Sequence, residues 1–317
     1  INKLDSYGSL SHKSIEDLEV GHRVDPAPGK KNPLDFVLWK PAKADEPKWE
    51  SPWGAGRPGW HIECSVMAKS LLGEQIDIHG GGIDLIFPHH ENECAQLECI
   101  SKKNFVQTWM HHNFVLLNNN KMSKSLGNII SAASFLEKYN AELLKYFMLS
   151  SHYRSLLHLN DETLTHSIKA LHRIYTCLTR LKNQADDSVP LDQKHDTFLA
   201  EKNQAFEDAL LDDLNTPAAF SQLFEVIRYT NQELDTKPQG ALSKKVFTWL
   251  QDKGKRFALF QEEPNVFLDE LSTIFLTENN LKKEDISHLI QKRQDARKNK
   301  EFSTADAIRD ELTQKGS

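Results

Sequence analysis

The residue composition and the hydrophobic pattern of the sequence change near residue 130, and this change limits the folds that the chain can adopt. Glycine, proline, tryptophan and histidine are concentrated before that point, among short apolar runs. Beyond it glycines are few, and apolar residues recur at spacings of three and four over long stretches, which is typical of amphipathic helices. The pattern predicts an α/β region followed by an all-α region.

Composition excludes several classes of protein. A length of 317 residues allows about two or three domains, and 39% hydrophobic residues are enough for a core. No run of about 18 apolar residues occurs, so we expect no membrane span. The 4 cysteines include no C-x-x-C pair, which favours a reduced, cytoplasmic compartment. A net charge of −6 argues against a generally basic coat for nucleic acid but permits a local basic groove.

Strands alternate with helices in the first region. The predicted strands cover residues 36–39, 76–78 and 114–117, and the predicted helices cover residues 60–72 and about 89–101. Gly73 ends the first helix, and Pro88 opens the second in the favoured first-turn position for proline. This alternation predicts a parallel sheet.

Helical periodicity fills the second region. The predicted helices cover residues 131–149, 160–183, 195–211, 215–235, 241–252, 264–277, 285–299 and 302–314. Short breaks containing proline or glycine separate several of them, so we expect a helical bundle.

Histidine is concentrated in one segment, and this predicts a metal site. Six of the 14 histidines fall between residues 61 and 112, where even spacing would put about two or three. They are His61, His79, His89, His90, His111 and His112. His89 and Glu93 share one helix face, and Cys64 lies on the preceding helix; all three are residue types that bind zinc.

Spacing leaves two alternatives to that site open. His90 and Cys94 have the same separation of four residues as His89 and Glu93. The histidines could also be ordinary hydrogen-bonding residues on polar helix faces.

A basic loop follows the strand at residues 114–117. Lys121-Met-Ser-Lys-Ser125 places two ammonium groups and two hydroxyls together, which suits neutralisation of a leaving pyrophosphate. A bare K-x-x-K could equally be a solvated turn.

The whole of this loop resembles a known signature. Lys121–Ser125 is identical to the KMSKS motif of class I aminoacyl-tRNA synthetases. Three further segments closely resemble cysteinyl-tRNA synthetase: residues 56–65, residues 79–84 and residues 87–93. The resemblance continues through residues 152–155, 212–217 and 295–310, so it covers essentially the whole chain.

The resemblance implies a fold and a set of domains. Residues 1–130 would be the C-terminal part of a class I Rossmann-type catalytic domain, with the zinc site and the KMSKS loop. Residues 131–165 would be a stem-contact connector, and residues 166–317 a helical tRNA-binding bundle. The family's other zinc cysteine and its HIGH motif precede the point that matches Ile1, so we expect an N-terminal part to be absent and this chain alone to be inactive.

The resemblance also implies roles for individual residues. One zinc ion per chain would be held by Cys64, His89 and Glu93, which selects between the two pairings left open above. The fourth ligand, a cysteine, would lie before this chain. The other implied positions are Trp60 in the cysteine pocket, Asp84 facing the substrate ammonium, His79 in the pocket, Ser123 and Lys124 on ATP, and Lys121 and Lys124 as catalytic lysines.

The implied enzyme is a cysteine–tRNA ligase. It would use ATP with Mg to form cysteinyl-adenylate and then charge tRNA(Cys), with zinc selecting the substrate thiolate over serine. The expected partners are tRNA(Cys), cysteine and ATP, with no membrane, and the expected state is a monomer. The alternatives are a cysteine–amino-sugar ligase of thiol biosynthesis and a non-catalytic zinc RNA-binding module.

Overall fold

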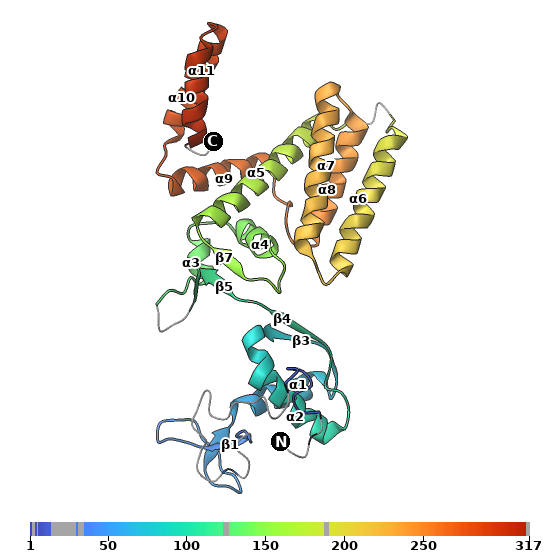
Figure 1. The fold of residues 1–317 in the computed structure, drawn as a ribbon, viewed down its shortest axis with the longest axis vertical. Helices are drawn as coiled ribbons and strands as arrows, with labels where there is room; N and C mark the ends of the chain where they lie inside the picture. Colours follow the sequence, from blue (N-terminus) through green and yellow to red (C-terminus); the bar gives the residue numbers. More distant parts are fainter. Residues whose placement is uncertain are drawn as a thin grey trace. The chain divides into compact units, whose positions relative to one another are not determined.

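The chain divides into two compact units. The computed structural model describes residues 1, 4, 6–13, 30, 35–122, 127–186 and 190–314. Unit 1 comprises Ile1–Phe114 and Tyr153–Ser155, and unit 2 comprises Val115–His152 and Leu156–Ser317 (Figure 1). The domain limits at residues 130 and 165 stay a prediction.

Unit 1 is built on a strand–helix–strand crossover. Strands β3 (Ile76–Gly82) and β4 (Val106–His112) are parallel, with Ile76 opposite Val106, and helix α2 (Glu91–Ser101) lies between them in the chain. Before them, β1 (Trp39–Pro41) and β2 (Gly56–Pro58) pair as an antiparallel hairpin and lead into α1 (Trp60–Leu72). The predicted parallel α/β arrangement is therefore confirmed.

A small apolar core fixes α2 to the two parallel strands. It consists of Ile76, Cys94, Leu97, Phe105 and Val106, all less than a tenth exposed. Because α2 is held by this core, its first turn is kept beside the end of β3. Helix α1 contacts α2 and ends at Gly73, whose φ of 98° favours glycine.

Three details of unit 1 differ from the sequence-based expectations. The strand expected at residues 36–39 is wrong: β1 begins at Trp39, and Val37 and Leu38 are 40% and 49% exposed. An apolar run this short cannot by itself distinguish a buried strand from a surface segment. Strand β4 was not predicted, because polar residues interrupt its apolar pattern.

The second predicted helix begins slightly later than expected. Phe87 is extended, with φ −132° and ψ 131°, and this kinks the segment Ile86–His90, called here the π-turn, before α2 begins at Glu91. A short 3₁₀ turn (Ile83–Leu85) connects β3 to this π-turn. The chain thus bends twice between β3 and α2, at the segment that carries His89 and His90.

Unit 2 begins with a three-stranded sheet. β5 (Val115–Leu117) pairs antiparallel with β6 (Asn120–Lys121) and parallel with β7 (Leu157–Leu159). β5 matches the strand predicted at residues 114–117 within one residue. The hairpin between β5 and β6 carries the start of the basic loop.

The rest of unit 2 is helical, as the periodicity predicts. The helices are α3 (Ala132–Leu136), α4 (Ala141–Leu149), α5 (Asp161–Gln184), α6 (Gln193–Leu211), α7 (Thr216–Thr236), α8 (Gly240–Lys255), α9 (Pro264–Glu278), α10 (Lys283–Lys298) and α11 (Phe302–Gln314). The helix predicted at residues 131–149 is divided, because Asn140 caps the N-terminus of α4 by accepting from Leu143 N. In the part of the chain that the structure describes, no helix is long and apolar enough to cross a membrane.

Helix α5 is the centre of the bundle. It contacts α4, α7, α8 and α9, and Leu171, Ile174 and Leu178 on it are completely buried. Its buried Tyr175 donates a 2.9 Å hydrogen bond to Glu142 of α4, which also accepts from Phe260 N at 2.8 Å. Both bonds are accepted by Oε1 of Glu142, which thus joins α4, α5 and the segment that follows α8.

Truncation of a core leucine should destabilise unit 2. Leu223 on α7 is completely buried, so L223A should lower the free energy of unfolding by about 3 kcal/mol, through lost burial and a residual cavity. Chemical denaturation followed by circular dichroism measures the change. Leu211 is 83% exposed, and L211A is the matched control with little expected effect. Equal stability losses in the two variants would contradict this packing.

Candidate functional site

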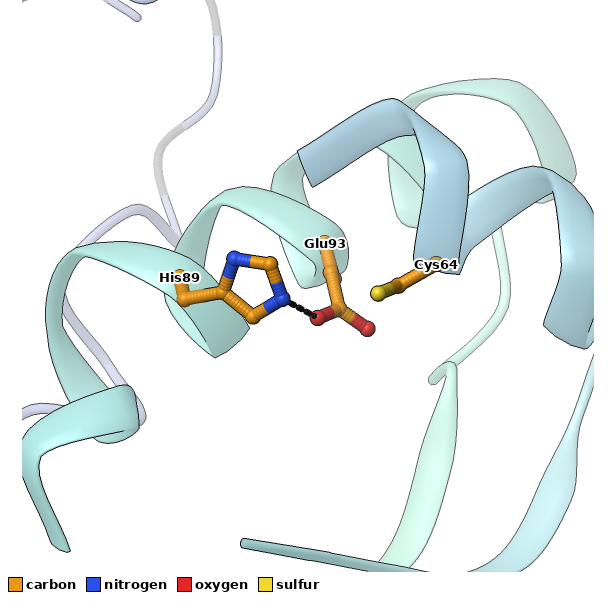
Figure 2. A group of neighbouring side chains, drawn as sticks. All are labelled: Cys64, His89 and Glu93. Atoms are coloured by element: carbon orange, nitrogen blue, oxygen red, sulfur yellow. Dashed lines mark ion pairs between the residues drawn. The ribbon is translucent and has the colours of Figure 1, made fainter. Parts of the chain in front are cut away.

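Three segments of unit 1 bring a thiol, an imidazole and a carboxylate together. Cys64 comes from α1, His89 from the π-turn and Glu93 from α2, and their side chains point toward one another (Figure 2). Their donor atoms all lie within 4.8 Å of one another. His89 and Glu93 are buried, and Cys64 is partly exposed. The three residues expected from the sequence to bind metal thus lie in one cluster.

Glu93 is the most constrained member of this cluster. Its side chain is 0% exposed, with Oε1 2.8 Å from His89 Nε2 and Oε2 3.7 Å from His79 Nε2. Despite these approaches, neither oxygen has a well-directed hydrogen bond within the described part of the chain. Burial raises the pKa of Glu93 to about 7. A buried carboxyl with unsatisfied oxygens is costly unless a further partner binds it.

The surrounding histidines are held neutral. Burial, with smaller contributions from neighbouring imidazoles, lowers the pKa of His61 to about 4 and that of His90 to about 3. Burial also lowers the pKa of His79 and His89. Neutral imidazole is the form that binds metal.

The acidic members of the cluster are held toward their neutral forms. Burial is the main cause that raises the pKa of the Cys64 thiol, and the carboxylates of Glu93 and Glu63 raise it further. A divalent cation at this place would reverse that effect and satisfy both oxygens of Glu93. The donor set of sulfur, nitrogen and oxygen is one that zinc accepts, so the residues present fit the expected metal.

A second group of potential ligands shares Glu93. It consists of His79, His90 and Glu93, and its donor atoms also lie within 4.8 Å of one another. His90 Nδ1 lies 2.8 Å from His111 Nε2, which leaves only Nε2 of His90 for this group. The pairing of His90 with Cys94 is not formed, because Cys94 faces the apolar core of unit 1.

Aromatic rings flank the histidines on two sides. Trp60 is 55% exposed, so it is not a core residue, and its ring centroid lies 4.2 Å from that of His89. His61 Nδ1 is 2.9 Å from His89 Nδ1. A hydrogen bond between these two nitrogen atoms fixes the orientation of the His89 ring. The Nε2 atom of His89 is then directed at Glu93.

Two residues of β4 belong to the site: Trp109, which was not expected there, and His111, which was expected only as one of the clustered histidines. The Trp109 ring lies 4.7 Å from that of His79 and stacks on His111 with an interplanar angle of 9°. The period-two spacing of Trp109 and His111 could have revealed them, had the strand been recognised.

The remaining sequence-predicted residues lie outside the cluster or outside the described residues. Asp84 is exposed in the 3₁₀ turn after β3 and belongs to neither group of donor atoms. Lys121 ends β6 in unit 2. Ser123 and Lys124 lie outside the described residues, so their roles stay predictions.

Comparison with known proteins identifies the family. Residues 1–169 match the tRNA synthetases class I (C) catalytic domain. The chain belongs to this family. Residues 205–261, within the helical unit, match the DALR domain. The predicted fold class is therefore confirmed: part of a class I synthetase catalytic domain followed by a helical domain.

Relatives of this synthetase family cover nearly the whole chain. A protein of Caldicellulosiruptor saccharolyticus is 46% identical over 99% of the chain, one of Geobacter sp. (strain M21) is 43% identical over 99%, and one of Idiomarina loihiensis is 45% identical over 100%. All three are named cysteine–tRNA ligase. The chain spans 65%, 66% and 65% of their respective lengths.

Substitution of the thiol tests whether the cluster holds a metal. In the intact protein, C64A should lower zinc content clearly below that of the wild type, because the donor set loses a sulfur ligand. Metal analysis after dialysis measures this. Cys99 is exposed on α2 and outside the cluster, so C99A is the matched control and should keep its zinc. Equal zinc content in C64A and C99A would rule out Cys64 as a ligand.

Proposed function

We propose that the intact protein is a cysteine–tRNA ligase. It uses ATP with Mg to convert cysteine to cysteinyl-adenylate, and it then transfers the cysteinyl group to tRNA(Cys). The observation that carries the proposal is the cluster of Cys64, His89 and Glu93 inside a class I synthetase catalytic domain. The names of the relatives support the same reaction.

The cluster suits selection of a thiol. Zinc bound there would prefer a thiolate to a hydroxyl and would lower the pKa of the substrate thiol. A site that demands one specific polar bond can discriminate by about 10⁴–10⁵-fold, whereas a hydrophobic pocket separates cysteine from serine only modestly. The chain therefore needs no separate editing step to reject serine.

Neighbouring side chains hold the metal-binding cluster in place. Burial of Glu93 removes competing water from its oxygens, and the His61–His89 contact fixes the imidazole. The exposed face of Trp60 beside His89 is available to a small side chain, so we assign Trp60 to the cysteine pocket. We assign His79 to the same pocket, and Asp84 to the substrate ammonium.

The basic loop provides the ATP contacts in this proposal. Lys121 and Lys124 neutralise charge that develops on the leaving pyrophosphate, and Ser123 and Lys124 bind the ATP phosphates. Such electrostatic stabilisation accelerates phosphoryl and adenylyl chemistry without a covalent intermediate on the protein.

The helical unit would bind tRNA. Its DALR match and its length favour a tRNA substrate over a small amino sugar, which requires no such bundle. We assign the protein to the cytoplasm, because its 4 cysteines are free thiols, and we expect it to act as a monomer.

Cysteine-dependent exchange between ATP and pyrophosphate is the direct test. The intact protein should catalyse this exchange with cysteine far faster than with serine, and it should then charge tRNA(Cys). Exchange followed by ligation to an amino sugar, with no charging of tRNA, would favour the thiol-biosynthesis enzyme. RNA binding without any exchange would identify a non-catalytic module.

Removal of the second loop lysine should impair activation selectively. K124A in the intact protein should slow cysteine-dependent exchange about a hundredfold, as loss of one transition-state donor does, and leave the KM for cysteine nearly unchanged. The exposed Lys138 gives the control K138A, which should retain normal exchange. A collapse of cysteine affinity in K124A would show that its assigned role is wrong.

A further inference from the structure

The two sides of the first turn of α2 contact different parts of unit 1. Glu93 faces the metal-binding cluster, whereas Glu91 lies about 200° around the helix from it, since successive residues are separated by about 100°. Glu91 and Asn92 are only 1% and 2% exposed, so both are buried next to the ligand residues. Their side chains bind a part of the chain that supplies no ligand.

That part is the segment of residues 6–13, called here the anchor loop. The Glu91 carboxylate accepts a 2.7 Å hydrogen bond from Gly8 N at one oxygen and a 2.9 Å hydrogen bond from Ser11 N at the other. The Tyr7 hydroxyl donates a 2.7 Å hydrogen bond to Asn92 Oδ1. Three hydrogen bonds, two of them charge-assisted, thus join the loop to the start of α2.

The anchor loop is itself tightly shaped. Gly8 has a φ of 97°, and a Cβ added to it would lie 2.0 Å from the carbonyl oxygen of Lys13, so only glycine fits. Lys13 N closes the turn by donating to Gly8 O at 3.1 Å. Tyr7 packs on Ala95 of α2, and Leu10 packs against the apolar core of unit 1. The loop is therefore a fixed template and not a loose terminal segment.

We infer that the anchor loop positions the metal ligands. Glu91 of α2 is the main positioning residue, because it accepts two hydrogen bonds from the loop. This inference rests on the proposed metal centre. Glu91 lies between His89 and Glu93 in the sequence, so its two hydrogen bonds hold both ligands from the side opposite the cluster. Metal ligands must be held within a few tenths of an ångström, and loss of such supporting contacts typically costs about 10–100-fold in metal affinity.

Two substitutions test the inference in the intact protein. E91Q keeps one acceptor oxygen and replaces the other by an NH2 group, which cannot accept a hydrogen bond, so the bond from either Gly8 N or Ser11 N is lost. This variant should raise the zinc dissociation constant about tenfold or more. Y7F removes only the bond to Asn92 and should act in the same direction but more weakly. Competition with a chromophoric chelator measures the zinc dissociation constant, and the visible spectrum of the cobalt-substituted protein reports ligand geometry.

A matched control exists on the same helix. Glu98 accepts a 3.2 Å hydrogen bond from Phe105 N near the far end of α2. E98Q makes the same chemical change away from the ligands, keeps one oxygen that can accept from Phe105 N, and should keep wild-type zinc affinity. Under the proposed function, E91Q should also raise the KM for cysteine and leave the KM for ATP unchanged. A general loss of stability would instead reduce the amount of folded enzyme and lower the apparent kcat, with no selective rise in the KM for cysteine.

The outcomes separate the inference from the proposed metal centre. Folded E91Q with wild-type zinc affinity and an unchanged cobalt spectrum would overturn the inference. If E91Q does not fold, Y7F decides, and wild-type affinity in folded Y7F would overturn it. If the wild-type protein binds no zinc, the metal centre itself is wrong, and the inference is overturned with it.

Discussion

The buried carboxyl of Glu93 is the constraint on which the site depends. It has no exposure to water, it is close to two imidazoles, and its oxygens lack well-directed hydrogen bonds in the described part of the chain. Removing a carboxylate from water costs several kcal/mol unless a partner compensates. Burial raises the pKa of Glu93, and the histidines around it are neutral. A bound cation would lower that pKa and stabilise the carboxylate form.

The fold of unit 1 holds Glu93 and the other residues of the cluster in place. The β3–α2–β4 crossover and its small core fix the axis of α2, and the anchor loop holds the first turn of α2 from behind. Cys64 arrives from α1, which contacts α2 directly. The cluster is thus assembled from separate segments, each held by packing or hydrogen bonds that do not involve the ligand atoms.

Sequence periodicity predicts most helices of unit 2 well, because each has an apolar face that packs on a neighbouring helix. The helices α4, α7, α8 and α9 contact α5, whereas α6 contacts α7 and α10 contacts α11. It fails at β4, where Gln107 and Thr108 interrupt the pattern, and at residues 36–39, where apolar side chains are partly exposed. Spacing alone could not choose between His89–Glu93 and His90–Cys94; the resemblance to a known family made that choice. The structure brings the first pair together and buries Cys94 in the core. The role of Glu91 could not be predicted, because its partners are backbone N–H groups of Gly8 and Ser11, which have no side-chain signature.

The central claim is that this cluster holds a metal that binds the substrate thiol. X-ray absorption at the zinc edge of the intact protein, with and without cysteine, tests it most directly. The account predicts sulfur and nitrogen or oxygen neighbours in the free protein, and an additional sulfur at about 2.3 Å when cysteine is added, but not when serine is added. A zinc spectrum without sulfur, or one that cysteine leaves unchanged, would contradict the account.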